Sequence, residues 1–384
     1  MAIFGIVIFH LLGAGPIPSF WSNGYIQFQT ATFGQLIDVL FIVSGFVVFM
    51  PTAARGNFGS YGRYAIRRAA RLLPAYWLIL ILTMLVLAYA PTEFERTFPS
   101  VAAIAMHAFG LQTLTSYSDS LGAVGFGVVG PVWTLTVEIG FYLVLPFVAM
   151  AFYRHVRLGL LAGALIAVAW TQAGLNANDA AAFIGLDITA ATAHRISLAT
   201  GTQFPFWAFS FALGMAGARL FVACRRRWTR AELEPLAVRA QLAGLAGLVI
   251  CAVLIYLDPD SGTGTIPAEV VRYSPLVSLG FSASLATFMV AVALGPPAMQ
   301  RPFANRPIRW LAEISYGVYL SHALFIFLAV WTFGYTLDQS ISGFLVLFAG
   351  VMPASILYGY LSARFLEQPI RRWARKFGGR ADQS

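Results

Sequence analysis

The chain has 384 residues, of which 59% are hydrophobic and only 11% are charged. A water-soluble domain has too little interior to hide that much apolar surface, so the composition argues against a soluble enzyme. The formal net charge of +9 does not indicate a nucleic-acid-binding protein, because the basic residues stand in short segments between apolar runs.

Apolar runs follow one another along the whole chain, and most approach the ~20 residues that a helix needs to cross a bilayer. In chain order they cover 2–14, 34–50, 72–90, 133–153, 158–174, 203–222, 240–257, 275–294, 310–331 and 341–363. They predict an all-α polytopic integral membrane protein with about ten transmembrane helices. No repeat and no polar linker divides the chain, so we expect a single membrane domain over residues 1–384.

The stretch 101–115 is also apolar, but it is shorter and contains His107, Gly110 and Gln112. If it does not cross the membrane and the N-terminus is cytoplasmic, 22 of the 25 basic residues fall in cytoplasmic segments. Those segments are 51–71, 154–157, 219–239, 295–309 and 364–384. A span at 101–115 would reverse every later segment and remove this asymmetry. The positive-inside rule therefore predicts that 101–115 is interfacial or re-entrant and that both termini are cytoplasmic.

The cellular setting follows from the same basic residues. Lys376 is the only lysine among them, a bias typical of G+C-rich coding, which favours a bacterial source. For a bacterial protein with helical spans we expect the inner, cytoplasmic membrane. The tail after about Arg364 is short and basic, and it suits contact with anionic membrane lipids better than a folded module.

Five ionisable side chains fall inside the predicted spans, where each costs free energy and usually faces a cavity or a partner. They are His10, Asp38, Glu138, Glu313 and His322. Glu313 lies near the cytoplasmic end of its span and can pair with Arg309 four residues earlier. Hydrogen-bonded groups that only fix helix packing would explain any one of them. The whole set, which includes two histidines able to move protons, favours a shared polar site.

Arginines cluster at the start of the third span. Arg68 and Arg71 share one face of a helix, and Arg67 also matches Arg71 at a spacing of four residues. Guanidinium groups arranged in this way can bind phosphate with paired hydrogen bonds. An ordinary topology signal that contacts lipid phosphates explains them as well, and the residues alone favour that reading. We find no P-loop, dinucleotide fingerprint or metal-ligand set.

Six short motifs occur in order across nearly the whole chain. They are Phe9-His10; Gly34-x-x-x-Asp38-x-x-Phe41-x-x-Ser44-Gly45-Phe46; Arg67-Arg68-x-x-Arg71-Leu72-x-Pro74; Trp133-Thr134-Leu135-x-Val137-Glu138-x-x-Phe141-Tyr142-x-x-x-Pro146; Ile314-Ser315-Tyr316-x-x-Tyr319-Leu320-x-His322; and Glu367-x-Pro369. In this order they resemble acyltransferase family 3, the membrane O-acyltransferases of bacterial surface polysaccharides and antibiotics.

The resemblance implies transfer of an acyl group, expected to be acetyl, from cytoplasmic acyl-CoA to a hydroxyl of a sugar, glycan or macrolide-like molecule. Acyl-CoA is then a donor substrate, and no cofactor is bound permanently. The family's catalytic base maps to His10, and its CoA-associated arginine motif maps to Arg68 and Arg71. We expect Asp38 or Glu138 to orient the His10 imidazole, as in other His–carboxylate pairs, and His322 is the next candidate for catalysis.

One part of the family pattern is missing. The family has an arginine eleven residues before the histidine of the first span, a position that here would precede Met1. The run 2–14 is also shorter than a full span. Two explanations stay open, a start assigned too far downstream or an incomplete protein.

Two other classes of function compete with an enzyme. A proton-coupled transporter of a small solute would also place histidines and carboxylates inside its spans, but no inverted repeat is visible. A non-catalytic membrane scaffold would leave the intramembrane ionisable residues unexplained.

Overall fold

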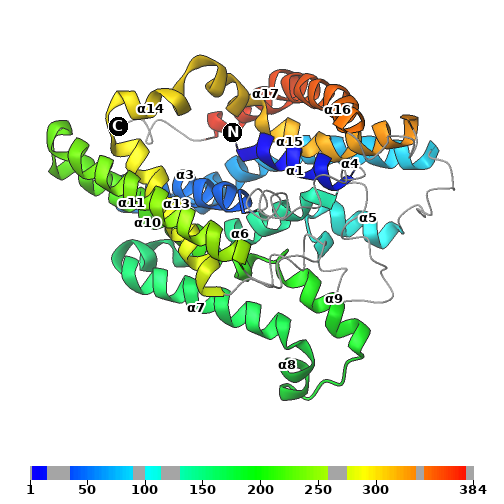
Figure 1. The fold of residues 1–384 in the computed structure, drawn as a ribbon, viewed down its shortest axis with the longest axis horizontal. Helices are drawn as coiled ribbons and strands as arrows, with labels where there is room; N and C mark the ends of the chain where they lie inside the picture. The colour runs from blue at the N-terminus through cyan, green and yellow to red at the C-terminus, as the bar shows by residue number, and fades with distance from the viewer. Residues whose placement is uncertain are drawn as a thin grey trace.

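The computed structural model describes residues 2–14, 35–89, 100–113, 130–257, 275–333 and 341–377. Every regular element in these ranges is a helix (Figure 1). The long helices are α1 (Ala2–Ala14), α3 (Ile37–Arg55), α4 (Tyr61–Tyr89), α6 (Trp133–Arg154), α7 (Val156–Leu175), α10 (Ala208–Arg227), α11 (Arg230–Leu257), α13 (Pro275–Leu294), α15 (Arg306–Phe333) and α16 (Ile341–Ser362).

The shorter elements lie between the long helices or follow them. They are α5 (Val101–Ala108), η6 (Gly130–Val132), α8 (Ala177–Phe183), α9 (Ala190–Thr200), η7 (Phe204–Trp207), α14 (Pro297–Ala304), the π-helical turn η10 (Ala363–Glu367) and α17 (Gln368–Lys376).

Each of the ten predicted spans corresponds to one long helix. Within the described part of the chain, nine helices are long and apolar enough to cross a bilayer, and α1 is a shorter apolar helix. The prediction of an all-α polytopic membrane protein is therefore confirmed. The eight residues of α5 rise only about 12 Å, too short to cross ~30 Å of hydrocarbon.

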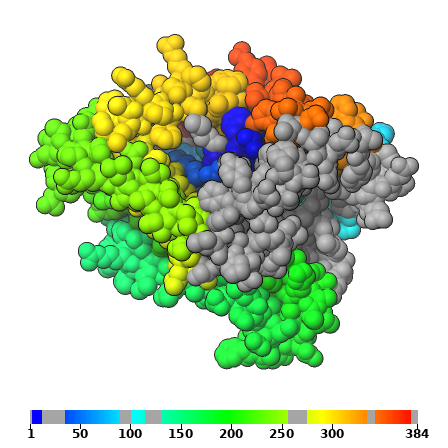
Figure 2. Space-filling view, viewed as in Figure 1, coloured from blue at the N-terminus to red at the C-terminus, as the bar shows by residue number. Residues whose placement is uncertain are grey.

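The outside of the bundle is apolar, as a protein surrounded by lipid requires. Phe147 on α6 is 85% exposed, and Ile250 on α11 is 59% exposed. Helix α11 runs along one edge of the molecule (Figure 2). A soluble protein would not leave so many large apolar side chains on its surface, so we assign these faces to lipid contact.

Helices α3 and α10 approach each other closely at two glycines. A Cβ atom added to Gly45 would collide with the carbonyl oxygen of Phe211, and one added to Gly214 would collide with that of Ile42. The two backbones therefore touch with no side chain between them, the arrangement that small residues permit in membrane helices. The ring of Phe211 also stacks on Phe141 of α6, with 4.1 Å between the ring centroids.

Gly214→Ala should destabilise the protein, because the added methyl group lies 2.8 Å from the backbone nitrogen of Phe46 and forces α3 away from α10. Overpacking of this kind costs about 1–3 kcal/mol. Thermal unfolding of the purified protein in detergent measures the effect. Gly350→Ala on α16 is the matched control, since its Cβ meets no atom within 4 Å. Equal melting temperatures for the two variants would contradict this account of the α3–α10 contact.

Candidate active site

Helices α1 and α15 bring two histidines into contact. The Nε2 atom of His322 lies 3.3 Å from Nδ1 of His10, although 312 positions separate them in the sequence. The ring centroids are 5.0 Å apart. His322 has no solvent-exposed surface, and His10 is partly buried. We call these two residues the histidine pair.

Backbone carbonyl groups also contact both rings. Nδ1 of His10 lies 2.8 Å from the carbonyl oxygen of Ile6, one helical turn earlier. Nδ1 of His322 lies 2.5 Å from the carbonyl oxygen of Tyr319. Each ring is therefore fixed by its own helix as well as by the other ring.

The first turn of α6 packs against the histidine pair through Tyr319. The Tyr319 hydroxyl donates to the carbonyl oxygen of Pro131. It lies 2.7 Å from Oγ1 of Thr134. The ring of Tyr319 lies 5.5 Å from that of His322, centroid to centroid. The sequence analysis assigned no role to Thr134 or Tyr319, although both stand in motifs that carried the family resemblance.

Glu138 lies further along α6 and is bonded to hydroxyl groups. Oγ of Ser44 on α3 donates to Oε1 of Glu138 at 2.9 Å. The hydroxyl of Tyr142, four residues later on α6, donates to the same oxygen. The hydroxyl of Tyr64 on α4 donates to the carbonyl oxygen of Tyr142 at 3.0 Å. The carboxylate thus connects α3 and α6 next to the N-terminal part of α4.

Arg68 lies over aromatic rings in this region. Its guanidinium carbon is 5.6 Å from the ring centroid of Tyr142 and 6.0 Å from that of Tyr64, within the range of a cation–π interaction. The Nε atom of Arg68 is buried, and no described residue accepts a hydrogen bond from it. A buried, charged donor without a partner needs an explanation, and an anionic ligand supplies one.

Helix α17 adds a third arginine. Arg371 lies within electrostatic reach of Arg71. Its Nη2 atom is 4.0 Å from the carboxylate of Glu367, which accepts a hydrogen bond of 3.1 Å from Ser362. We call Arg68, Arg71 and Arg371 the arginine cluster. Sequence reasoning missed Arg371, because nothing in the one-dimensional pattern indicates that the tail packs against α4.

Tyrosine hydroxyl groups connect the arginine cluster to the histidine pair along α15. The Tyr316 hydroxyl donates to the carbonyl oxygen of Leu72, next to Arg71, at 2.9 Å. Tyr319 is one turn further along the helix, and His322 is almost one turn beyond that. At 1.5 Å per residue the six residues from Tyr316 to His322 cover about 9 Å. A seam of polar groups therefore runs inside the bundle from the arginines to the histidines.

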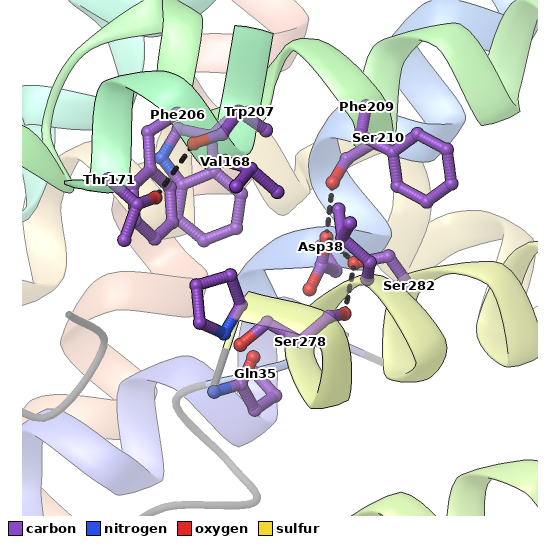
Figure 3. A pocket seen from close by; sticks show the side chains of 13 residues that line it. Gln35, Asp38, Val168, Thr171, Phe206, Trp207, Phe209, Ser210, Ser278 and Ser282 are labelled. Atoms are coloured by element: carbon purple, nitrogen blue, oxygen red, sulfur yellow. Dashed lines mark hydrogen bonds between the residues drawn. The ribbon is translucent and has the colours of Figure 1, made fainter. Parts of the chain in front are cut away.

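Asp38 lies in a different place. It is 2% exposed, and its Oδ1 accepts hydrogen bonds from Ser210 on α10 at 2.5 Å and from Ser282 on α13 at 2.9 Å. Asp38 lines a pocket, and Gln35, Thr171 and Ser278 also line it (Figure 3). These bonds tie α3 to α10 and α13.

The structure brings together some of the predicted site residues and not others. His10 and His322 are in contact, whereas the hydrogen-bond partners of Asp38 and Glu138 are hydroxyl groups. Within the described residues neither carboxylate is a hydrogen-bond partner of His10, so the orienting role expected for one of them stays a prediction. Glu313 is exposed on α15 and lies within electrostatic reach of Arg371. The role of His10 as base and the donor-binding roles of Arg68 and Arg71 are likewise still predictions.

Two kinds of comparison relate the chain to known proteins. The family model of acyltransferase family 3, described as an acyltransferase domain, matches residues 1–360. The peptidoglycan O-acetyltransferase OatA of Listeria monocytogenes serovar 1/2a (strain ATCC BAA-679 / EGD-e) is 24% identical over 367 residues, which are 91% of this chain and 53% of OatA. YrhL of Bacillus subtilis (strain 168) is 23% identical over 364 residues, 90% of this chain and 52% of YrhL.

The chain thus spans about half the length of these curated relatives. No solved structure matches it. The family match runs from the helix that carries His10 almost to the end of α16 and includes every motif of the resemblance except Glu367-x-Pro369. The resemblance is confirmed, and the chain belongs to acyltransferase family 3.

Proposed function

We propose that the chain is a membrane O-acyltransferase that moves an acetyl group from acyl-CoA to a hydroxyl group of a cell-surface glycan. The observation that carries the proposal is the contact between His10 and His322 inside the bundle. A polar seam joins this contact to the partly buried Arg68, whose Nε atom is fully buried. A general base and a phosphate-binding cluster are the two parts that such a reaction needs from the protein. The relative OatA is named for acetylation of peptidoglycan, which makes a peptidoglycan sugar the first acceptor to test.

The chemistry requires the protein to take up one proton and then release it. His10 accepts the proton of the acceptor hydroxyl while the hydroxyl oxygen attacks the thioester carbonyl carbon. The new C–O bond forms, the C–S bond breaks, and the proton then passes to the departing CoA thiolate. Acetyl-CoA and the free hydroxyl become CoA and an O-acetyl ester, with no oxidant or metal required.

The arginine cluster is proposed to bind the phosphate groups of the donor. CoA phosphates cannot enter hydrocarbon without a large cost in free energy, and Arg68 and Arg71 lie where α4 enters the apolar part of the bundle. We assign this end of the bundle to the cytoplasm, where acyl-CoA is available and where the positive-inside rule puts the basic segments.

The orientation can be tested with single cysteines in a variant without Cys224 and Cys251. Residues Arg55 and Arg226 lie at the same end of the bundle, since Arg226 donates a hydrogen bond to the carbonyl oxygen of Ala54. Cysteines at both positions should react only with membrane-permeant thiol reagents in intact cells. A cysteine at Ile184, beyond the far end of α7 and 67% exposed, should react with impermeant reagents. The reverse pattern would overturn the proposed orientation.

Arg71→Ala should weaken binding of acetyl-CoA by about 10- to 100-fold, the usual cost of losing a charge-assisted hydrogen bond. Calorimetric titration of the purified protein in nanodiscs measures the dissociation constant. Acetyl-pantetheine, which lacks phosphate groups, should bind the variant and the wild type equally. Arg157→Ala on α7, an exposed arginine, is the matched control and should not change either affinity. If Arg71→Ala left the affinity for acetyl-CoA unchanged, the arginines would be explained as a topology signal and not as a donor-binding site.

His10→Ala should reduce acetyl transfer by about 10²- to 10⁴-fold, the range for loss of a general base. Binding of acetyl-CoA should persist, because the arginine cluster lies at the other end of the polar seam. The measurement is transfer of radiolabel from acetyl-CoA to soluble peptidoglycan fragments. His155→Ala, which removes an exposed histidine between α6 and α7, controls for nonspecific effects. Full activity of His10→Ala would remove this residue from the catalytic role.

A further inference from the structure

The contacts of the histidine pair determine where each ring carries its proton. A backbone carbonyl oxygen accepts hydrogen bonds and cannot donate them. Nδ1 of His322, 2.5 Å from the carbonyl oxygen of Tyr319, must therefore be protonated. The same argument applies to Nδ1 of His10, 2.8 Å from the carbonyl oxygen of Ile6.

The remaining nitrogen atoms then carry lone pairs. A neutral imidazole has one N–H group, and a second proton on either ring would put a charge inside the apolar bundle. The lone pair on Nε2 of His322 faces Nδ1 of His10 at 3.3 Å. Nδ1–H of His10 is thus shared between Ile6 and His322, and Nε2 of His10 is left with an unprotonated lone pair. Within the described residues no protein group is a hydrogen-bond partner of that Nε2 atom.

We propose that His322 is a positioning residue that holds His10 in the Nδ1–H tautomer, so that Nε2 of His10 is the atom that accepts the proton of the acceptor hydroxyl. The proposal rests on the proposed function and deepens it. In serine proteases a buried aspartate orients the catalytic histidine through the same kind of contact with Nδ1–H. Here a second, neutral imidazole takes the place of the carboxylate.

The burial of the pair explains why an imidazole, rather than a carboxylate, accepts the hydrogen bond from Nδ1–H of His10. A carboxylate that faced His10 in this buried setting would cost free energy in every state in which His10 is neutral. An imidazole acceptor carries no charge before the reaction. When Nε2 of His10 takes up the hydroxyl proton, the positive ring still donates through Nδ1–H to His322 and to Ile6. The pair thus stabilises the transient charge without burying a permanent one.

The carboxylates and hydroxyls that pack near the pair do not offer the same contact. Tyr319 and Thr134 bond to each other and to Pro131, and Oε1 of Glu138 accepts hydrogen bonds from Ser44 and Tyr142. His322 is therefore the side chain that the described structure presents to Nδ1 of His10.

Two substitutions separate positioning from packing. His322→Gln keeps an acceptor, because its amide oxygen can reach the position of Nε2. His322→Leu fills a similar volume without an acceptor. We expect kcat to fall at least about 100-fold in His322→Leu and to recover to within about 10-fold of wild type in His322→Gln. The dissociation constant of acetyl-CoA should be unchanged in both. His107→Leu, which removes a buried histidine bonded only to backbone on α5, controls for general loss of packing.

A spectroscopic measurement tests the tautomer directly. In the protein with ¹⁵N-labelled histidine in nanodiscs, the two ring nitrogens of His10, assigned by comparison with His10→Ala, should show Nδ1 protonated and Nε2 unprotonated. His322→Gln should preserve this pattern, and His322→Leu should give a mixture of tautomers. Equal kcat in the Leu and Gln variants, or a wild-type His10 protonated on Nε2, would overturn the proposal.

The two readouts also separate this proposal from the function on which it rests. If the wild-type chain shows the expected tautomer but transfers no acetyl group to any glycan tested, the proposed function fails and the positioning contact stands. If His322→Leu does not insert into the membrane, the wild-type tautomer and the kcat of His322→Gln decide the question.

Discussion

Hydrocarbon offers no hydrogen-bond partners, so each polar group inside this bundle has to be satisfied by another part of the protein. Asp38 meets the requirement with Ser210 and Ser282, which come from two other helices. The histidine pair meets it with the carbonyl oxygens of Ile6 and Tyr319. The bonds of Asp38 and the contact between His10 and His322 join helices that are distant in sequence, and they fix how these helices rotate about their own axes. The same groups therefore build the fold and supply its chemistry.

Asp38 and the histidine pair differ in whether their contacts suit the fold or the chemistry. Asp38 lies beside the α3–α10 contact, where Gly45 and Gly214 let the backbones touch, and its bonds to hydroxyl groups suit a residue that stabilises packing. In the histidine pair, Nε2 of His10 has no hydrogen-bond partner among the described residues. A buried group with an unused lone pair is a poor choice for stability alone, and it is what a general base requires.

The sequence predicted the helices well and their contacts poorly, for physical reasons. Hydropathy reports the apolar length of each span, so the predicted and observed helices agree to within a few residues at most of their ends. The exceptions are at arginine-rich ends: α4 begins at Tyr61 rather than at residue 72, and α11 begins at Arg230 rather than at residue 240. Long arginine side chains keep their charges in the interface while the helix continues, and hydropathy does not register that extension.

Pairing between spans depends on helix rotation, which no single-sequence pattern contains. Asp38 or Glu138 was expected to orient His10 by analogy with other His–carboxylate pairs, yet the serine partners of Asp38 lie 172 and 244 positions away on other helices. His322 was a candidate because an ionisable residue in a span is costly and because it closes one of the motifs that carry the family resemblance. That it touches His10 could be learned only from the packing of α1 against α15.

The separation of the arginine cluster from the histidine pair follows from the same cost of charge in lipid. If acyl-CoA is the donor, as proposed, its phosphate groups have to stay where Arg68 and Arg71 can neutralise them, whereas its thioester carbonyl is neutral and can enter the bundle at little cost. The hydroxyl groups of Tyr316 and Tyr319 line the interval between them, and each is already bonded to a carbonyl oxygen. They can therefore accept further hydrogen bonds from a polar, uncharged chain but have no proton left to donate. Under the proposed function, an interior of this kind would admit the amide-bearing arm of CoA and exclude its charged end, so the distance from Arg71 to His10 would select which part of the donor reaches the proposed base.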